Sequence, residues 1–270
     1  MLDAIPQIGF GTWQRRGDEA TTTVRAAIEC GYRHIDTAQA YGNEAEVGKG
    51  IADSGIARDD LWVTTKIQPS DLGPGQVRPK TEESLEKLGL EQLDLLLVHW
   101  PAVDGQYEME DYLGQFMEVQ DAGLTRKIGV SNFTIAYIDQ ALSILGDREL
   151  TTNQVELHPF LRNGPIVEHC KSKGIPLTAY SPLARGEIAE DAVIKSIAGE
   201  LEATEAQVVL AWLMAKGIIV IPTSSKSERI EANLKATEIQ LTSKQMMTMD
   251  GLHRNERLIS GPHAPEWDEE

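Results

Sequence analysis

Short runs of apolar and β-branched residues alternate with longer amphipathic stretches along the whole chain. We interpret this alternation as parallel strands joined by crossover helices, because the chain must return to the starting end of a sheet before it can add a parallel neighbour. Eight runs are strand candidates, and eight is the number that closes an α/β barrel. These runs are residues 7–11, 34–36, 61–66, 93–99, 127–131, 152–156, 176–180 and 218–221.

Amphipathic patterns typical of helices lie between the candidate strands. Thr204 followed by Gln207 predicts a capping box, in which the two side chains satisfy unpaired backbone donors at a helix start. Gly89 and Gly217 each follow a helical pattern, where a residue that can adopt a positive φ ends a helix. The predicted helices include residues 20–29, 43–53, 77–88, 109–120, 136–145 and 204–215.

A doubly wound dinucleotide-binding fold would also alternate strands with helices. That fold needs a G-x-G-x-x-G turn that opens directly into a helix, whereas residues 9–14 read GFGTWQ and lack the third glycine. No linker or low-complexity tract divides the chain. We therefore predict an α/β fold, a single-domain (β/α)8 TIM barrel over residues 1–270, with an irregular tail at residues 261–270.

The charge balance restricts the partners of the protein. The chain has 25 Lys and Arg against 42 Asp and Glu, and this net charge of −17 repels nucleic-acid phosphates and anionic membranes. No segment reaches the ~18 apolar residues of a membrane span, and the first residues do not resemble a secretory signal. Cys30 and Cys170 are too few for a disulfide framework. We expect a cytoplasmic protein with a small-molecule substrate, without nucleic acid, membrane or metal as a partner.

Four titratable side chains of different chemistry follow the candidate strands. Asp36, Lys66 and His99 end the second, third and fourth strands, and Tyr41 lies in the loop after Asp36. We expect these side chains to meet, because the carboxyl ends of barrel strands all lie at one end of the barrel. Each residue alone is more often a helix cap or a packed rim residue, so the prediction of an active site depends on their joint placement.

This group of side chains suits proton transfer coupled to hydride transfer. A nearby ammonium favours the phenolate, so we expect Lys66 to lower the pKa of Tyr41 and make its phenol a stronger acid. Asp36 would keep Lys66 charged and oriented, and His99 would donate a hydrogen bond to the substrate oxygen. Tyr41, Lys66, Asp36 and His99 are therefore the candidate catalytic residues.

Motifs spread in order along nearly the whole chain resemble those of the aldo-keto reductases. They are DTAQAYGNE at 36–44, TK at 65–66, LVHWP at 97–101, GVSNF at 129–133, QVELHP at 154–159 and AYSPL at 179–183. The resemblance implies a monomeric barrel that holds NADP(H) across its mouth and reduces carbonyl groups. It also implies that Asp36, Tyr41, Lys66 and His99 form the catalytic tetrad, with Tyr41 as the general acid in reduction and the base in oxidation.

The same resemblance implies further roles around the mouth. Ser131, Asn132 and Gln154 would hold the carboxamide of the cofactor, and Tyr180 would stack on its nicotinamide ring. Trp13 and Trp100 would line the substrate pocket, whereas we expect core packing for Trp62 and Trp212. The complete set of implied cofactor residues is Thr12, Ser131, Asn132, Gln154, Tyr180, Ser181, Leu183, Thr223, Ser224, Ser225, Lys226, Arg229 and Asn233.

A polar cluster after the last candidate strand could bind the 2′-phosphate of NADP. Three hydroxyl residues at 223–225 precede Lys226, and Arg229 lies one turn into a predicted helix. A helix N-terminus offers unpaired N–H groups, which hydroxyls and cations would complete. Many family members carry Lys where this chain has Thr223 and Glu where it has Ala232, so we predict a preference for NADPH over NADH that is weaker than at a fully basic site.

Within the family, residues 221–226, 233–236 and 264–268 are most similar to bacterial 2,5-diketo-D-gluconate reductases of the short B type, which also reduce methylglyoxal. We therefore expect small polar carbonyl substrates of this kind, and a short tail that leaves the pocket open. Two alternatives stay open. One is a non-catalytic barrel that binds NADP(H) and serves as a regulatory subunit. The other is a lyase in which Lys66 forms a Schiff base, a common use of a buried lysine.

Overall fold

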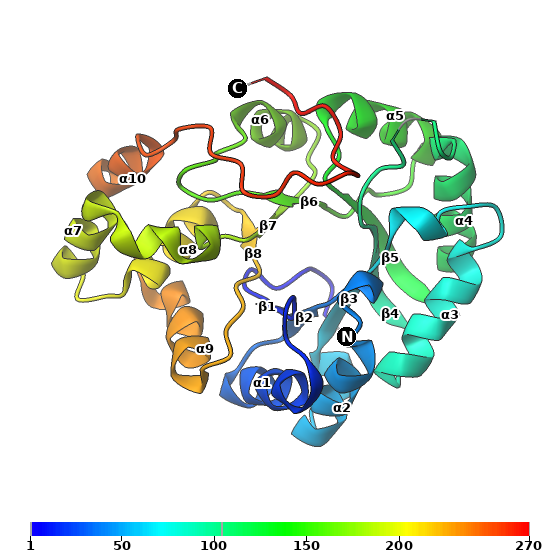
Figure 1. The fold of residues 1–270 in the computed structure, drawn as a ribbon, viewed down its shortest axis with the longest axis horizontal. Helices are drawn as coiled ribbons and strands as arrows, with labels where there is room; N and C mark the ends of the chain where they lie inside the picture. Colours follow the sequence, from blue (N-terminus) through cyan, green and yellow to red (C-terminus); the bar gives the residue numbers. More distant parts are fainter. Residues whose placement is uncertain (1, 104, 270) are drawn as a thin grey trace.

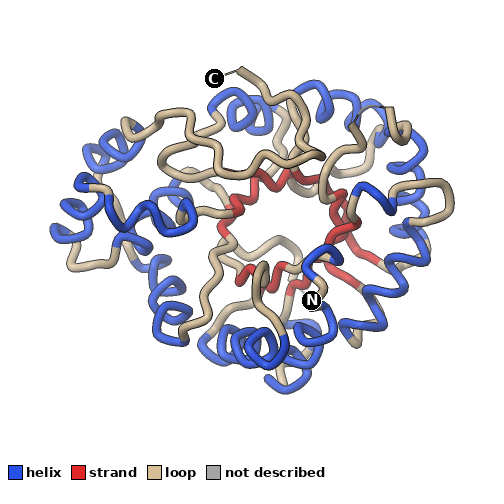
Figure 2. The backbone as a smooth tube through the Cα atoms, in the orientation of Figure 1, coloured by secondary structure: helices blue, strands red, loops and turns tan. Residues whose placement is uncertain are grey.

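In the computed structural model, which describes residues 2–103 and 105–269, eight parallel strands form one sheet in chain order. Helices surround this sheet on the outside (Figure 1), and the strands follow one another around a ring (Figure 2). The strands are β1 (Phe10–Gly11), β2 (His34–Asp36), β3 (Trp62–Ile67), β4 (Leu93–Val98), β5 (Thr125–Ser131), β6 (Asn153–Glu156), β7 (Leu177–Tyr180) and β8 (Ile219–Val220).

A seam of backbone hydrogen bonds joins the last strand to the first. Gly9 N donates to Val220 O at 2.8 Å, and Val220 N donates to Gln7 O at 3.0 Å. Gly11 N continues the ladder to Pro222 O at 2.9 Å. The sheet is therefore closed, which confirms the predicted (β/α)8 fold. The first strand is shorter than predicted, because only Phe10 and Gly11 pair with β2 while Ile8 forms an isolated bridge to Val220.

The helices begin and end largely where local sequence chemistry predicts. The capping box of α8 is present, since Gln207 N donates to Thr204 Oγ1 at 3.2 Å and Thr204 N donates to Gln207 Oε1 at 2.9 Å. The helices are α1 (Gly17–Cys30), α2 (Glu44–Ser54), α3 (Val77–Leu88), α4 (Met109–Asp121), α5 (Ile135–Leu145), α6 (Gly164–Ser172), α7 (Ala192–Glu200), α8 (Glu205–Ala215), α9 (Ser227–Leu234) and α10 (Ser243–Asp250). In the part of the chain that the structure describes, no helix is long and apolar enough to cross a membrane.

Two glycines of α2 allow its neighbouring helices to approach closely. A Cβ atom on Gly50 would lie 2.7 Å from the carbonyl oxygen of Thr21 in α1. A Cβ atom on Gly48 would lie 2.5 Å from the carbonyl oxygen of Leu88 at the end of α3. Both distances are shorter than van der Waals contact, so α2 can pack between these helices only without side chains at these positions.

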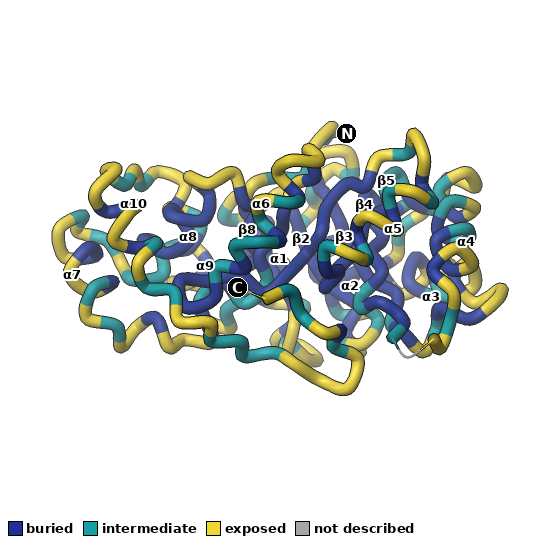
Figure 3. The backbone as a smooth tube through the Cα atoms, turned by 90° about the horizontal axis from the view of Figure 1, so that it is seen from above, coloured by how far each residue is buried: buried dark blue, intermediate teal, exposed yellow. Residues whose placement is uncertain are grey.

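Apolar side chains form one large core, and buried polar side chains lie among them on the strands, where His34 contacts Thr64 and Thr152 contacts Thr178. Trp62, Leu95 and Leu97 form a small cluster of their own, separate from the larger core. Figure 3 shows that buried residues follow the strands and exposed residues the outer turns. Trp62 and Trp212 are 0 % and 1 % exposed, which confirms that they are core residues.

Candidate active site

The predicted site residues meet at one end of the barrel. Asp36 is the last residue of β2, Lys66 is the last but one of β3, and His99 directly follows β4. Tyr41 ends the 3-10 turn η1 (Gln39–Tyr41), which follows β2. Because all strands are parallel, their carboxyl ends lie at the same rim, and the loops after them share the same space.

A buried ion pair lies at the centre of this group. Lys66 Nζ donates to Asp36 Oδ1 at 2.5 Å and to the carbonyl oxygen of Thr37 at 2.7 Å. Gln154 Nε2 donates to the other carboxylate oxygen of Asp36 at 2.8 Å. Burial by itself lowers the pKa of Lys66, but Asp36 and then Tyr41 outweigh it, so the pKa lies above its ordinary value. Lys66 is therefore an ammonium at neutral pH.

Tyr41 lies beside this ammonium. Lys66 Nζ is 5.2 Å from the centre of the Tyr41 ring. The pKa of Tyr41 lies above its ordinary value, although Lys66 acts on it in the expected direction. Burial, which disfavours the phenolate, is the largest effect and raises the pKa, while the charge of Lys66 and its hydrogen bond lower it only in part. Tyr41 therefore carries its proton at neutral pH.

His99 faces the phenol from the end of β4. The centres of the Tyr41 and His99 rings are 5.8 Å apart, with their planes 78° from parallel. Burial, followed by the positive charge of Lys66, lowers the pKa of His99 to about 3. The imidazole is therefore neutral and carries one N–H. Asn132 Nδ2 donates to the main-chain oxygen of His99 at 3.0 Å and so fixes the start of this loop.

The predicted carboxamide and stacking residues form one hydrogen-bonded group. Tyr180 donates its hydroxyl to Asn132 Oδ1 at 2.8 Å, and Ser131 Oγ donates to the carbonyl oxygen of Gln154 at 2.7 Å. Asn132 adopts a positive φ of 63°, which turns the chain directly after β5. The bond from Gln154 to Asp36 joins this group to the buried ion pair.

The two tryptophans predicted to line the pocket lie at the rim. Trp13 is 37 % exposed, and the guanidinium of Arg185 lies 5.0 Å from its ring centre. Trp100 is half-buried and packs against Trp267 of the C-terminal tail, with ring centres 6.0 Å apart. The contacts of Arg185 and Trp267 were not predictable from the sequence, because each joins segments that are far apart in the chain.

The remaining implied cofactor residues lie in three places. The Oγ1 atom of Thr12 donates to the main-chain oxygen of Asp36 at 3.1 Å, so this hydroxyl stabilises the scaffold. Ser181 adopts a positive φ of 47° immediately after β7, and Leu183 lies two residues later in the same loop. Asn233 is buried on α9.

The polar segment after β8 has the features of an anion site. Thr223 Oγ1 is buried and has no hydrogen-bond partner among the described residues. Ser224 Oγ accepts from the backbone N–H of Lys226 at 3.1 Å, and Ser225, Lys226 and Arg229 are exposed. No side chain caps the start of α9. An unpaired hydroxyl, free helix N–H groups and two cations fit a phosphate.

Comparisons with known proteins agree on one family. The model of the aldo/keto reductase family matches residues 7–254. The chain is 44 % identical to methylglyoxal reductase DkgB of Escherichia coli O157:H7, over 98 % of this chain and all of that protein. It is 38 % identical to glyoxal reductase of Bacillus subtilis, over 97 % of this chain and 93 % of that protein.

Solved structures give the same result. An aldo-keto reductase of Bombyx mori in complex with NADP superimposes with a TM-score of 0.88 at 33 % identity, covering 95 % of this chain and 92 % of that one. The aldose reductase of Schistosoma japonicum superimposes with a TM-score of 0.91 at 32 % identity, covering 97 % and 95 % of the two chains.

Proposed function

Because the chain belongs to the aldo/keto reductase family, we propose that it reduces small polar aldehydes and ketones to alcohols with NADPH, and that Tyr41 supplies the proton. That the chain is an oxidoreductase acting on carbonyl groups follows from its family. The observation that carries the finer proposal is the position of the Tyr41 phenol beside the buried pair of Lys66 and Asp36.

The rim of the barrel offers residues for each part of the cofactor. Ser131, Asn132 and Gln154 would hold the carboxamide, and Tyr180 would lie against the nicotinamide ring. The 2′-phosphate would occupy the anion site formed by Thr223, Ser224, Ser225, Lys226 and Arg229. Thr12, Ser181, Leu183 and Asn233 would complete the lining. When bound, reduced nicotinamide supplies hydride to the carbonyl carbon.

The residues of this chain would complete the reaction at the carbonyl oxygen. As negative charge develops there, the Tyr41 hydroxyl donates its proton to the oxygen and becomes a phenolate. The ammonium of Lys66 stabilises that phenolate, and Asp36 keeps the ammonium in place. The neutral ring of His99 donates a hydrogen bond to the same oxygen and so orients the carbonyl. In the reverse direction the phenolate accepts the proton of the alcohol.

The relatives support small dicarbonyl substrates. Methylglyoxal reductase DkgB and glyoxal reductase are both named for compounds of this size. We place such substrates between Trp13 and Trp100, which flank the rim beside Tyr41 and His99. A second polar group of the kind found in 2,5-diketo-D-gluconate would fit a rim that carries the charge of Arg185.

One assay separates this proposal from its alternatives. The purified protein is mixed with NADPH and either methylglyoxal or 2,5-diketo-D-gluconate, and the absorbance of NADPH is followed. We expect turnover. Cofactor binding without turnover would instead indicate a regulatory barrel, and trapping of a carbonyl compound on Lys66 by borohydride would indicate a Schiff-base lyase. A kcat/KM for NADH equal to or above that for NADPH would contradict the assigned cofactor preference.

The substitution Tyr41→Phe tests the proton donor. The variant keeps the ring but loses the hydroxyl, so we expect kcat to fall by about 10²–10⁴-fold, which is the usual contribution of a general acid. NADPH affinity, measured by fluorescence titration, should change by less than about twofold because the phenol is not needed to hold the dinucleotide. Wild-type kcat in this variant would remove Tyr41 from its assigned role.

A further inference from the structure

We infer that Glu156 is a positioning residue that holds the C-terminal strap, residues 254–268, against the substrate side of the site, and that the strap thereby determines which carbonyl compounds fit. This inference rests on the proposed function, because it concerns the substrate selectivity of the same site. The strap contains no helix or strand, and its fixed position therefore depends on side-chain contacts with the barrel. In Figure 1 it returns from α10 past the ends of β7 and β6 toward α5.

The carboxylate of Glu156 is fully buried and receives hydrogen bonds on both oxygens. The backbone N–H of Leu258 donates to Oε1 at 2.7 Å, and that of Ile259 donates to Oε2 at 2.9 Å. His158 Nε2 lies 3.0 Å from Oε1 as a third partner. Two successive N–H groups thus bind the two oxygens of one carboxylate, and each has an acceptor of its own.

The position of Glu156 on its strand connects the strap to the reacting groups. Side chains two residues apart on a strand point to the same side, so Glu156 and Gln154 share the inner face of β6. Gln154 binds Asp36 of the buried ion pair, while Glu156 binds the strap. One short strand therefore contacts both the proton-transfer group and the segment that covers it.

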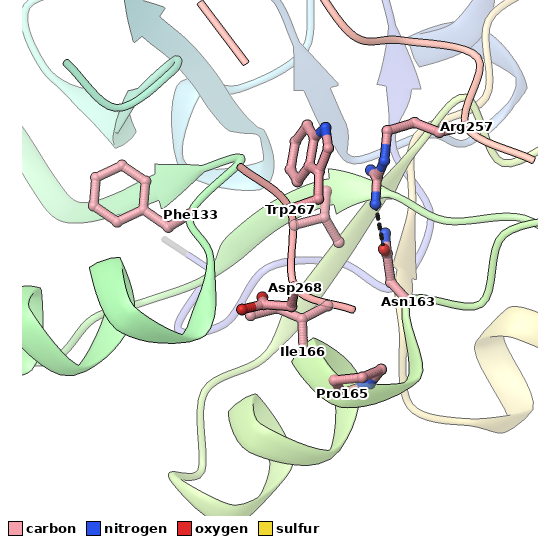
Figure 4. A pocket seen from close by; sticks show the side chains of 8 residues that line it. Phe133, Asn163, Pro165, Ile166, Arg257, Trp267 and Asp268 are labelled. Carbon is pink, nitrogen blue, oxygen red and sulfur yellow. Dashed lines mark hydrogen bonds between the residues drawn. The ribbon is translucent and has the colours of Figure 1, made fainter. Parts of the chain in front are cut away.

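A chain of contacts leads from this anchor to the pocket wall. Asn163 donates to the main-chain oxygen of Glu156 and accepts from Arg257 Nη2 at 2.8 Å. The guanidinium of Arg257 lies 3.8 Å from the ring centre of Trp267, and Trp267 packs edge to face against Trp100. Figure 4 shows Arg257 reaching past Trp267 toward Asn163. Since Trp100 directly follows His99, the strap sets the position of a wall next to the reacting carbonyl.

A second anchor fixes the far end of the strap. Asp268 Oδ2 accepts from the backbone N–H of Ile135 at 3.1 Å, at the first turn of α5. At the near end, the N–H groups of Arg254 and Glu256 both donate to the main-chain oxygen of Phe160. Glu156 holds the middle of the strap, so its loss should release the segment that carries Arg257 while both ends remain attached.

The experiment replaces Glu156 by glutamine in the full-length chain. Glutamine keeps one acceptor oxygen but turns an N–H₂ group toward a backbone donor, so one of the two strap bonds cannot form. We expect faster hydrogen exchange of the backbone N–H groups of Leu258 and Ile259. We also expect the ratio of kcat/KM for a bulky aromatic aldehyde to that for methylglyoxal to rise on the order of tenfold, with kcat for methylglyoxal changed by less than about twofold.

Asp94→Asn is the matched control. Asp94 is a buried carboxylate at the start of β4, at the opposite end of the barrel, and it receives hydrogen bonds from Arg58, Arg126 and the N–H of Val63. Its amide variant should lower stability as Glu156→Gln does, but should leave strap exchange and the substrate ratio at their wild-type values. A change of the ratio in both variants would assign the effect to general destabilisation and overturn the inference.

A chain that ends at residue 260 tests whether Glu156 acts through the strap. It removes Trp267 and Asp268 and should show the raised ratio by itself, while Glu156→Gln in this short chain should add nothing further. An equal additional effect there would overturn the inference, as would unchanged exchange and selectivity in the full-length variant. If Glu156→Gln does not fold, Glu156→Asp, which withdraws the carboxylate by one methylene, serves for the same measurements.

These outcomes are separate from a failure of the proposed function. If the wild-type chain reduces no carbonyl compound, the proposed function is wrong, and the hydrogen exchange of residues 254–268 still shows whether Glu156 holds the strap. If the wild type reduces carbonyl compounds and the variants have its hydrogen exchange and its ratio of kcat/KM values, the proposed function stands and the inferred role of Glu156 is wrong.

Discussion

The substitution Asp36→Asn tests the central ion pair of the site. Lys66 and Asp36 are 0 % and 1 % exposed, so water cannot replace the lost partner of the ammonium. In the variant, the amide oxygen at position 36 and the carbonyl oxygen of Thr37 can still accept from Lys66, but neither carries the negative charge that balances the buried ammonium. Removing one member of a buried ion pair costs about 3–5 kcal/mol, because the remaining charge stays desolvated. We expect the free energy of unfolding to fall by this amount.

The same variant should also lose activity. Burial lowers the pKa of Lys66, and Asp36 is the largest influence that opposes it. Without the carboxylate the ammonium should lose its proton at a lower pH, and the Tyr41 phenolate formed during reduction would be less stabilised. We therefore expect kcat/KM to fall, with its basic limb shifted to lower pH, while NADPH affinity changes much less.

Urea unfolding followed by circular dichroism measures the stability change, and initial rates across a pH series measure the second effect. Asp121→Asn is the control, because Asp121 forms an exposed ion pair with Arg148 at 2.8 Å and its loss should change stability far less. If Asp36→Asn lowered the free energy of unfolding by less than about 1 kcal/mol, the ammonium would not be confined as described, and the reasoning would be refuted.

Three further perturbations test other parts of the structure. Burial lowers the pKa of His34 to about 4, so below about pH 6.5 the unfolded state binds a proton that the folded state does not. The contribution of His34 to the free energy of unfolding is therefore fully present above about pH 6.5 and is lost as the pH falls toward 4. When the pH is lowered from about 7.5 to 5.5, the free energy of unfolding measured in urea should fall by about 1 kcal/mol more in the wild type than in His34→Asn. Equal decreases in the two proteins would contradict this. Lys226→Ala should raise KM for NADPH about tenfold and leave KM for NADH unchanged, because only the former has a 2′-phosphate; equal increases for both would count against the assigned site. Gly48→Ala should lower stability by about 1–3 kcal/mol, since its Cβ would meet the main chain of Leu88, whereas Gly114→Ala on α4 has open space and should not; thermal unfolding compares the two.

Local sequence patterns predicted the barrel well, because each of its units is specified locally. The capping box at Thr204 and Gln207 involves residues three apart, and it forms as expected. The strand ends that carry Asp36, Lys66 and His99 were also placed within a residue or two. The short helices α7 and α10 were not among the predicted ranges, since nine and eight residues are too few to show a clear helical period.

Features that depend on contacts between distant parts of the chain do not follow from local sequence patterns. The sign of the pKa shift of Tyr41 follows from how completely the fold buries the phenol, which the neighbouring residues do not reveal. The tail was expected to leave the pocket open, but Trp267 packs on Trp100 across the rim. Glu156 belongs to a recognised motif, yet its partners Leu258 and Ile259 lie about a hundred positions later.

The seam between the first and last strands has a consequence for biosynthesis. The side chain of Gln7 binds Met214, which lies 207 residues later, and its main-chain oxygen binds Val220, which lies later still. A ribosome must therefore complete nearly the whole chain before β1 gains its second neighbour. Until then the nascent sheet has two unpaired edges, each able to capture a strand of another molecule. Premature termination before Ile219 should therefore give fragments that aggregate. Chaperones would bind this protein mainly before β8 has paired with β1.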